Sequence, residues 1–457
     1  MLDASISTAA AAGLFEPATA AEMRAAPPSG GTMRDGLRGR DDGALRDRLV
    51  SLNTSELARI IPVGLDNARN RLEQARTLSR AVTLDLFPGV SVTAERKDIE
   101  APDEGGYIWA GEANGNDPSF VTLVINNNSV LGQIQKGGRL YSIEPVSGRL
   151  HRIIEIDESK IPKDMHVPLP PGAIPNKSEA AEPPADVAAA GTVTKIKVLV
   201  ANTITARAEC VAGGTVAQDQ QCMQARINLA ISLANQAFAR SGVLIKFVRV
   251  GGQIEVNYAD TTVYGTNTAN NYTGMLCDLT NFPNCFGTGN NQTGKFAGVR
   301  GKREQYDADL VVLMRKAGAA CGIAWVPDPP TAADSNSGFS VVTSTKGNYN
   351  CIEGHTLAHE TGHNMGLHHD RYVEPAASNA KFNYGYVDTA PAGRFRDIMS
   401  YPDKCAAAGV SCTRIPYMST PLKLYNGRKI GIPQNQAGAA DGARTLNATR
   451  AIVGAYR

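Results

Sequence analysis

Residues 355–370 read HTLAHETGHNMGLHHD and contain five of the chain's seven histidines. His359 and His363 are four residues apart, so an α-helix would place both imidazoles on one face, one turn apart. Glu360 follows His359 directly and can reach a water held at a metal without being a ligand itself. This stretch therefore predicts a helix that carries two metal ligands and a catalytic carboxylate.

The residues at the end of that helix indicate which histidine is the third ligand. Gly366 permits the left-handed backbone that stops a helix abruptly, so the chain can turn back and present His369. Three imidazoles with an open fourth position are typical of one catalytic Zn²⁺, whereas a structural zinc ion has four protein ligands. We expect Asp370 to orient or cap the turn after His369. His355 and His368 do not fit the ligand spacing, and we interpret them as structural or surface residues.

Composition narrows the class of protein. The 457 residues are 42% hydrophobic and 20% charged, which allows a sizeable core and suggests two or three domains. A net charge of +2 argues against a nucleic-acid binder and against a polybasic membrane binder. No stretch approaches the roughly 20 apolar residues that cross a bilayer.

The cysteines indicate an oxidising compartment. All eight lie between Cys210 and Cys412, with no CxxC pair, which favours disulfides over a zinc ribbon. We expect the pairs Cys210–Cys222, Cys277–Cys285, Cys321–Cys351 and Cys405–Cys412, because three of these pairs close short loops. The first 16 residues do not match a signal peptide, so we expect a secreted protein whose signal was removed or that uses another route.

The N-terminal half predicts an antiparallel β-rich domain at 46–158. Residues 1–45 lack periodicity and are interpreted as a mostly disordered tail. The apolar residues of 65–81 recur at steps of three and four, which indicates a helix. Short apolar runs separated by turn residues predict strands: 82–87, 90–94, 107–111, 120–125, 130–134, 140–143 and 150–156.

A proline-rich segment follows. Residues 161–190 hold seven of the chain's 25 prolines, so we interpret 159–192 as an extended linker that a protease can cut. Residues 193–457 then alternate apolar runs and helical patterns, which predicts an α/β domain on a mixed sheet. The expected strands are 195–201, 244–250, 309–314, 322–326 and 339–343, and the expected helices are 224–240, 355–366 and 443–456.

The HExxHxxGxxH pattern resembles the signature of the metzincin zinc endopeptidases, which also carry a methionine turn downstream. Residues 397–401, DIMSY, supply a similar turn. The resemblance implies that Met399 lies beneath the metal as an apolar floor. Asp370 is similar to the reprolysin branch, whereas Tyr401 is similar to astacins and serralysins, where this tyrosine ligates zinc or stabilises the oxyanion. The GGxGxD repeats of serralysins are absent, so no calcium-bound repeat domain is implied, and a structural Ca²⁺ is left open.

The segments DLVVLM, CGIAW and TLNATRAIVGAYR look closest to bacterial reprolysin-like peptidases of the peptidyl-Asp type, over about residues 195–457. The resemblance implies a twisted mixed sheet with an active-site helix, and hydrolysis of protein or peptide substrates by water activated at zinc, with Glu360 as general base. It implies an edge strand for the substrate, for which we nominate 322–326. It also implies a preference for Asp on the carboxyl side of the cut, which requires a basic lining such as Lys404 or Arg414.

The preceding β domain occupies the place of a propeptide. We expect it to act as an intramolecular inhibitor of a zymogen, although a folding chaperone or docking module is an alternative. Residues 1–209 contain no cysteine, so a cysteine cannot block the zinc; an Asp, a Glu or steric cover would have to do so. The alternatives for the whole protein are a non-catalytic metzincin-like binding or toxin module and a zinc amidase on a small substrate.

Overall fold

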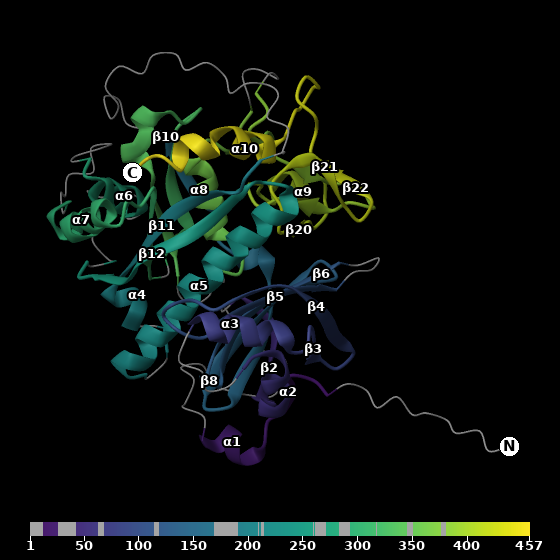
Figure 1. The fold of residues 1–457 in the computed structure, drawn as a ribbon. Helices are drawn as coiled ribbons and strands as arrows, with labels where there is room; N and C mark the ends of the chain where they lie inside the picture. The colour runs from purple at the N-terminus through teal and green to yellow at the C-terminus, as the bar shows by residue number, and fades with distance from the viewer. Residues whose placement is uncertain are drawn as a thin grey trace. The chain divides into compact units, whose positions relative to one another are not determined.

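The fold was analysed in a computed structural model, which describes residues 12–25, 43–62, 68–113, 118–168, 191–208, 210–211, 214–258, 260, 271–282, 293–316, 318–344, 351–375 and 381–457. The chain divides into two compact units. Unit 1 consists mainly of residues 46–137 and 141–155, and unit 2 mainly of residues 156–457. Each unit is described by itself (Figure 1).

Unit 1 is built on a nine-stranded sheet in the order β1-β2-β9-β8-β7-β6-β5-β4-β3. From β3 to β9 neighbouring strands follow one another in the sequence, because short turns such as that at Asn127 join them. The strands are β1 (Phe15–Pro17), β2 (Ala44–Leu52), β3 (Ala81–Phe87), β4 (Val90–Glu100), β5 (Tyr107–Ala113), β6 (Ser119–Asn126), β7 (Ser129–Lys136), β8 (Arg139–Ser147) and β9 (Leu150–Ile156). Trp109 lies fully buried in the core of this unit.

The start of the chain differs from the predicted disordered tail. Leu14 and Phe15 are buried, and β1 pairs antiparallel with β2, so these two apolar side chains join the core. Helix α1 (Ala20–Ala25) follows, and β2 begins at Ala44. The rest of the predicted tail, 1–11 and 26–42, lies outside the described residues. Helices α2 (Thr54–Ile60) and α3 (Ala68–Thr77) complete unit 1, the latter inside the helix predicted at 65–81.

Unit 2 has a six-stranded sheet in the order β10-β14-β15-β13-β11-β12. Its strands are β10 (Met165–Pro168), β11 (Thr194–Thr203), β12 (Ile245–Val256), β13 (Leu310–Arg315), β14 (Gly322–Val326) and β15 (Phe339–Thr343). Strand β14 runs antiparallel to β15, whereas β11, β12, β13 and β15 pair in parallel. The predicted mixed α/β architecture is therefore present.

Helices lie on both faces of this sheet. Every residue of β13 is buried, which is typical of a strand covered on its two sides. Helices α5 (Val216–Ser241) and α8 (Thr356–Asn364) pack against each other and against the sheet (Figure 1). Helices α6 (Asn271–Thr280) and α7 (Ala297–Gln305) share a core with Leu199 of β11 and Val311 of β13. Successive residues of a strand point to opposite faces of the sheet, so these two side chains mark the face that α6 and α7 cover.

The smaller elements surround these layers. They are η1 (Glu158–Lys160), α4 (Ile204–Ala208), η4 (Thr293–Phe296), η5 (Ala332–Ser337), β16 (His368–Asp370), β17 (Tyr384–Gly385), β18 (Val387–Asp388), β19 (Phe395–Arg396), α9 (Asp403–Ala407), β20 (Thr413–Arg414), β21 (Thr420–Tyr425), β22 (Arg428–Ile430) and α10 (Gly442–Val453). None of the helices in the described parts is both long and apolar enough to cross a bilayer.

Helix α5 starts eight residues before the predicted 224–240. Its first two turns are polar and lack the apolar periodicity on which the prediction rested. Thr215 and Gln218 form a reciprocal capping box there, and Gly242 in the left-handed region ends the helix. The capping residues, rather than the hydrophobic stripe, set where this helix begins.

The predicted linker is also structured at its start. Strand β10 lies within the interval 159–192 and pairs in parallel with β14, with Met165 opposite Ile323. Backbone hydrogen bonds to an existing sheet edge stabilise such a strand even where a proline-rich sequence could not fold alone. Residues 169–190 of the predicted linker lie outside the described residues.

Three of the predicted disulfides are confirmed: Cys210–Cys222, Cys321–Cys351 and Cys405–Cys412, with Cα atoms 5.9, 5.3 and 6.0 Å apart. For the fourth predicted pair, Cys285 lies outside the described residues. The Cys321–Cys351 bond joins the start of β14 to the loop before α8. The two elements that build the site are therefore held together covalently.

Candidate active site

Helix α8 supplies the first two imidazoles of the site. All nine of its residues are buried, and the Asn364 amide donates to Trp325 O and Phe339 O, both at 3.0 Å, so its end is fastened to the sheet. Gly366 follows with φ +91°, and a Cβ there would lie 2.7 Å from Pro330 Cδ. Both its conformation and its surroundings therefore require glycine.

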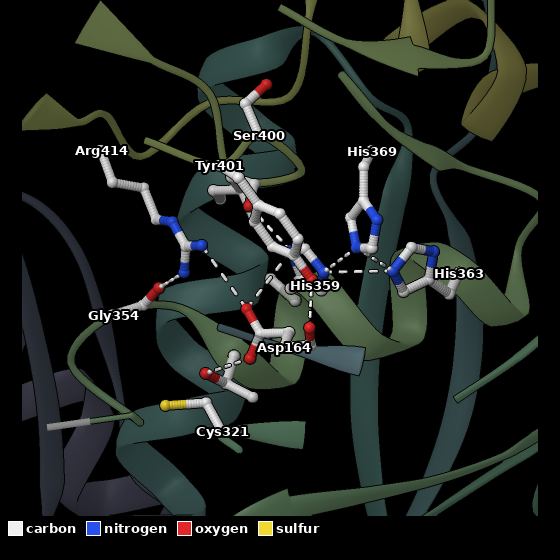
Figure 2. A network of polar contacts seen from close by, with 12 residues as sticks. Asp164, Cys321, Gly354, His359, His363, His369, Ser400, Tyr401 and Arg414 are labelled. Atoms are coloured by element: carbon white, nitrogen blue, oxygen red, sulfur yellow. Dashed lines mark hydrogen bonds and ion pairs between the residues drawn. The ribbon is translucent and has the colours of Figure 1, made fainter. Parts of the chain in front are cut away.

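The turn at Gly366 brings the third imidazole back to the helix. The Nε2 atoms of His359, His363 and His369 lie 3.1 Å from one another in all three pairings (Figure 2). All three side chains are buried. The spacing read from the sequence thus yields one compact group of donor atoms that could hold a metal ion.

The hydrogen bonds of the other ring nitrogens fix the chemistry of this group. His359 Nδ1 lies 2.9 Å from Ile398 O, and His363 Nδ1 lies 2.7 Å from Leu367 O. Because a carbonyl only accepts, both Nδ1 atoms carry the proton, which leaves a lone pair on each Nε2. His369 Nδ1 lies 2.6 Å from a carboxylate oxygen of Glu374 and follows the same rule.

Three lone pairs that face one point repel one another unless a cation lies between them. Protein groups that orient the ring and fix its tautomer are also what metal-binding histidines require. The donor set therefore fits a zinc ion held by neutral imidazoles. Glu374 was missed in the sequence, where no fixed spacing identifies such a carboxylate.

Glu360, the residue after His359, is fully buried. In the described part of the chain, neither of its carboxylate oxygens has a hydrogen-bond partner. Burial, followed by the charge of Asp164, raises its pKa well above the usual value. A Cβ on Gly322 of β14 would come within 2.7 Å of Glu360 Cγ, so this glycine leaves the room that the carboxylate occupies. The carboxylate therefore lies buried beside the imidazoles without a hydrogen bond from any described group.

The methionine turn lies beneath α8. A Cβ at Gly362 would lie 2.9 Å from Met399 Sδ, so the thioether packs directly against the helix between the two histidines. Met399 is 1% exposed. The neighbouring residue, Ile398, supplies the carbonyl that holds the His359 ring. Packing and hydrogen bonding from one turn thus support the imidazole cluster.

Tyr401 and Asp370 complete the wall behind the histidines. The Tyr401 ring lies 4.2 Å from the His369 ring, centroid to centroid, and its hydroxyl donates to Asp164 O. Asp370 accepts hydrogen bonds from Tyr401 N and Tyr372 N, both at 3.0 Å. Its carboxylate therefore joins the backbone after His369 to the backbone after the methionine turn.

Asp164, just before β10, is the second residue that sequence reasoning missed. It is 4% exposed, and its side chain lies between Arg414 and His359 (Figure 2). Oδ2 is 3.5 Å from an Arg414 Nη, and Oδ1 accepts from Thr356 Oγ1 at 3.3 Å. Burial raises its pKa, while Arg414 acts in the opposite direction. Its proline-rich surroundings concealed this aspartate among unremarkable linker residues.

The remaining candidates lie outside this group. His355 precedes α8 with φ +68°, and burial lowers its pKa to about 3. Burial opposes ionisation of His368, but hydrogen bonds to Asp328 and Glu374 outweigh it and raise the pKa to about 9. Of the two basic residues nominated beyond the methionine turn, Lys404 donates to Val387 O at 3.1 Å, and Arg414 reaches the site.

Comparisons with known proteins agree with this geometry. A family model described as metallo-peptidase family M12B, reprolysin-like, matches residues 224–370. The peptidyl-Asp metalloendopeptidase of Stenotrophomonas maltophilia strain R551-3 is 30% identical over 408 residues, which cover 85% of either chain. Its counterpart in Xanthomonas campestris pv. campestris is 28% identical and covers 81% of this chain and 80% of the relative.

A solved structure, metalloproteinase-II from Bacteroides fragilis, is also similar. It is 12% identical, covers 68% of this chain and 87% of its own, and aligns with a TM-score of 0.35. A likeness of that size carries no argument about this chain.

Proposed function

This chain belongs to the family of the peptidyl-Asp metalloendopeptidases, and from that premise we propose that it cuts peptide bonds beside aspartate, is made as a zymogen and is exported. The metalloendopeptidase class follows from the family itself. The finer proposal concerns the ligands, the general base, the inhibited form and the substrate. Each part is supported by a separate feature of unit 2.

The observation that carries the proposal is the convergence of three Nε2 lone pairs at 3.1 Å beside the carboxylate of Glu360. We propose His359, His363 and His369 as the ligands of one zinc ion. A carboxylate next to this trio that has no partner among the described groups is unexplained by stability, since a buried polar group without a hydrogen bond costs free energy. It is explained if Glu360 handles protons during hydrolysis.

The residues divide the chemistry between them. When bound, zinc polarises a substrate carbonyl and makes water a better nucleophile near neutral pH. Glu360 accepts the proton of the attacking water and delivers it to the leaving amine, and its raised pKa suits a group that must do both. The Tyr401 hydroxyl, which already donates to a backbone carbonyl, would donate to the oxygen that develops negative charge.

A peptide substrate would lie extended along β14, as the resemblance implied. Strand β10 now pairs with the edge of β14 opposite to β15, so a segment of the chain itself takes that place. This supports the proposal that the uncut chain is inhibited and that cleavage within 159–192 activates it. The disulfides of unit 2 support export to an oxidising compartment.

Mass-spectrometric mapping of the products from a peptide library tests the function. The uncut chain, and the same chain nicked by trypsin with every fragment retained, would each be assayed with and without a chelator. We expect cleavage beside aspartate that the chelator abolishes and that nicking accelerates. Chelator-resistant cleavage would contradict the zinc site. Equal rates of the two forms would contradict the inhibited form, and products without aspartate at the cut would contradict the specificity.

A further inference from the structure

Asp164 has the surroundings of a bound ligand rather than those of a linker residue. Its carboxylate is fully buried, and three elements distant in sequence contact it: Thr356 at the start of α8, Arg414 in β20, and Tyr401, whose hydroxyl binds its carbonyl. A surface linker has no reason to bury a charged side chain, because burial costs free energy unless the charge is paired. The segment 156–168 is therefore docked through this residue.

The carboxylate lies toward Arg414 and not toward the Nε2 atoms of the three histidines. Its Oδ2 lies 3.7 Å from His359 Nδ1, the nitrogen that is engaged by Ile398 O. The lone pairs of the trio face elsewhere. Asp164 thus marks a position where an acidic side chain is recognised beside the site, distinct from a position where a carboxylate replaces the water at a metal.

Contacts within unit 2 fix the position of the Arg414 side chain beside Asp164. Arg414 is 7% exposed, its Nη1 donates to Gly354 O at 2.8 Å, and it follows Cys412, which the Cys405–Cys412 disulfide restrains. A second acidic residue of the docked segment, Glu158, accepts from Arg414 N at 3.0 Å and lies 3.5 Å from Arg396. Removal of 156–168 would take both carboxylates away from two buried guanidinium groups.

We propose that Arg414 and Thr356 form the site that binds the aspartate side chain of the substrate, and that Asp164 occupies this site as a pseudosubstrate in the uncut chain. The inference rests on the proposed function and deepens it, because it names the residues that select the substrate. When Asp164 leaves, the buried guanidinium of Arg414 loses this carboxylate, and an aspartate of a peptide can take the same place.

The position of the Asp164 carbonyl explains why the docked segment is not itself the preferred substrate. The carbonyl that Tyr401 contacts is that of Asp164, so the bond presented to the site joins residues 164 and 165. The proposed preference places the cut before an aspartate, at the bond between residues 163 and 164. The Asp164 carboxylate is therefore bound while the bond between residues 164 and 165, and not the preferred bond between residues 163 and 164, faces the site.

Substrate selection by Arg414 is tested with matched peptides that carry Asp or Asn at the cut, using the tryptically nicked chain with all fragments retained. We expect Arg414→Met to reduce the ratio of kcat/KM for Asp over Asn by about 30-fold or more, and Arg414→Lys to keep part of it. Lys404→Met is the control, since it removes a cation beyond the methionine turn that does not reach Asp164. An unchanged ratio in Arg414→Met overturns the recognition site.

Occupancy by Asp164 is tested by hydrogen exchange in the full, uncut chain. Asp164→Asn should raise the exchange rate of the β10 amides about tenfold, Arg414→Met should do the same, and the double variant should add little. Lys163→Met, which removes the neighbouring ion pair with Asp403, is the control. An unchanged rate in Asp164→Asn overturns the proposal, and so does an effect that vanishes after chelation, because the carboxylate would then be a metal ligand.

The two proposals fail in different ways. If no form of the protein cleaves any peptide in a chelator-sensitive manner, the proposed function is wrong, and the exchange experiment still decides whether Asp164 and Arg414 are coupled. If cleavage persists and depends on metal while Arg414→Met leaves the Asp preference intact, only the recognition site is wrong. A melting curve of each variant, compared with that of the parent, identifies any that fail to fold, and Arg414→Lys then carries the test.

Discussion

His151 in unit 1 and His359 in unit 2 are alike in all but one respect. Both are fully buried, and in both Nδ1 donates to a backbone carbonyl, that of Arg149 at 2.8 Å and that of Ile398 at 2.9 Å. They differ at Nε2. In His151 this atom accepts from Val130 N at 3.0 Å, whereas in His359 it faces two other unprotonated imidazole nitrogens.

The difference separates a structural histidine from a functional one. His151 satisfies both ring nitrogens from within its own sheet, so nothing remains for it to bind. His359 is held in the same way at one nitrogen, but its other nitrogen faces two further imidazole nitrogens, an arrangement that could hold a metal ion. Burial and residue type alone therefore do not identify a ligand; the partner of the second nitrogen does.

The largest expected effect tests the carboxylate that the cluster leaves without a partner. Glu360→Gln keeps the size of the side chain and removes its ability to accept a proton, so we expect peptide hydrolysis to fall by 10²–10⁴-fold. Metal content, measured by elemental analysis of the dialysed protein, should remain that of the parent. Loss of metal together with activity would show that Glu360 is a ligand, and parent-like turnover would show that it is not the base.

Removal of the metal should have the next largest effect. Without a cation the three lone pairs repel, so a chelator should lower the free energy of unfolding by about 3 kcal/mol relative to metal at 100 times its dissociation constant. Thermal unfolding followed through Trp325, in a Trp109→Phe background, measures this in unit 2. His363→Ala is the matched control, because a chelator should no longer shift its midpoint. A parent that is indifferent to the chelator would contradict the cation site.

The sequence predicted the part of the site that is local. The ligand spacing, Glu360 and Gly366 lie within eleven residues, so one helix and one turn determine their geometry. Met399 and Tyr401 came from the resemblance, because no periodicity connects a turn to a helix 30 residues away. Two of the three confirmed disulfides could be guessed because their cysteines lie only 12 and 7 residues apart, whereas the Cys321–Cys351 pair spans 30 residues.

The rest depends on contacts that sequence patterns do not encode. Asp164 is 192 residues from Thr356 and 250 from Arg414, and it lies in a segment whose prolines predict an extended linker. Only strand pairing with β14 shows that the segment is docked. The apolar run of β14 did predict a strand, but not that its outer edge is covered. The start of α5 was also not predicted, because its first turns are fixed by capping residues and show no hydrophobic periodicity.

His369 differs from His359 and His363 in that its Nδ1 faces a carboxylate, that of Glu374, and not a backbone carbonyl. Glu374 lies 2.6 Å from His369 Nδ1 and 2.9 Å from His368 Nδ1. Glu374→Gln keeps the size of the side chain but removes the charge beside His369 Nδ1 that makes the imidazole a stronger donor to metal, so we expect zinc affinity to fall 10–100-fold. Competition with a chromophoric chelator measures the affinity. An unchanged affinity would indicate that the carbonyl-type partners are sufficient for all three rings.

The smallest effect concerns the structural histidine. Burial lowers the pKa of His151 to about 4, against 6.5 when the chain is unfolded. Between these values the unfolded chain binds a proton that the folded chain does not, so the stabilisation is complete above pH 6.5 and is lost as the pH falls toward 4. We expect a loss of roughly 1 kcal/mol by pH 5.5 relative to pH 7.5, from this group alone.

Fluorescence of Trp109 in a Trp325→Phe background reports the unfolding of unit 1. His151→Gln, which can donate and accept but does not titrate in this range, should show a flatter dependence on pH. Identical slopes for the two proteins would mean that the ring is not held neutral by its backbone partners, and the contrast with His359 would then not rest on Nε2.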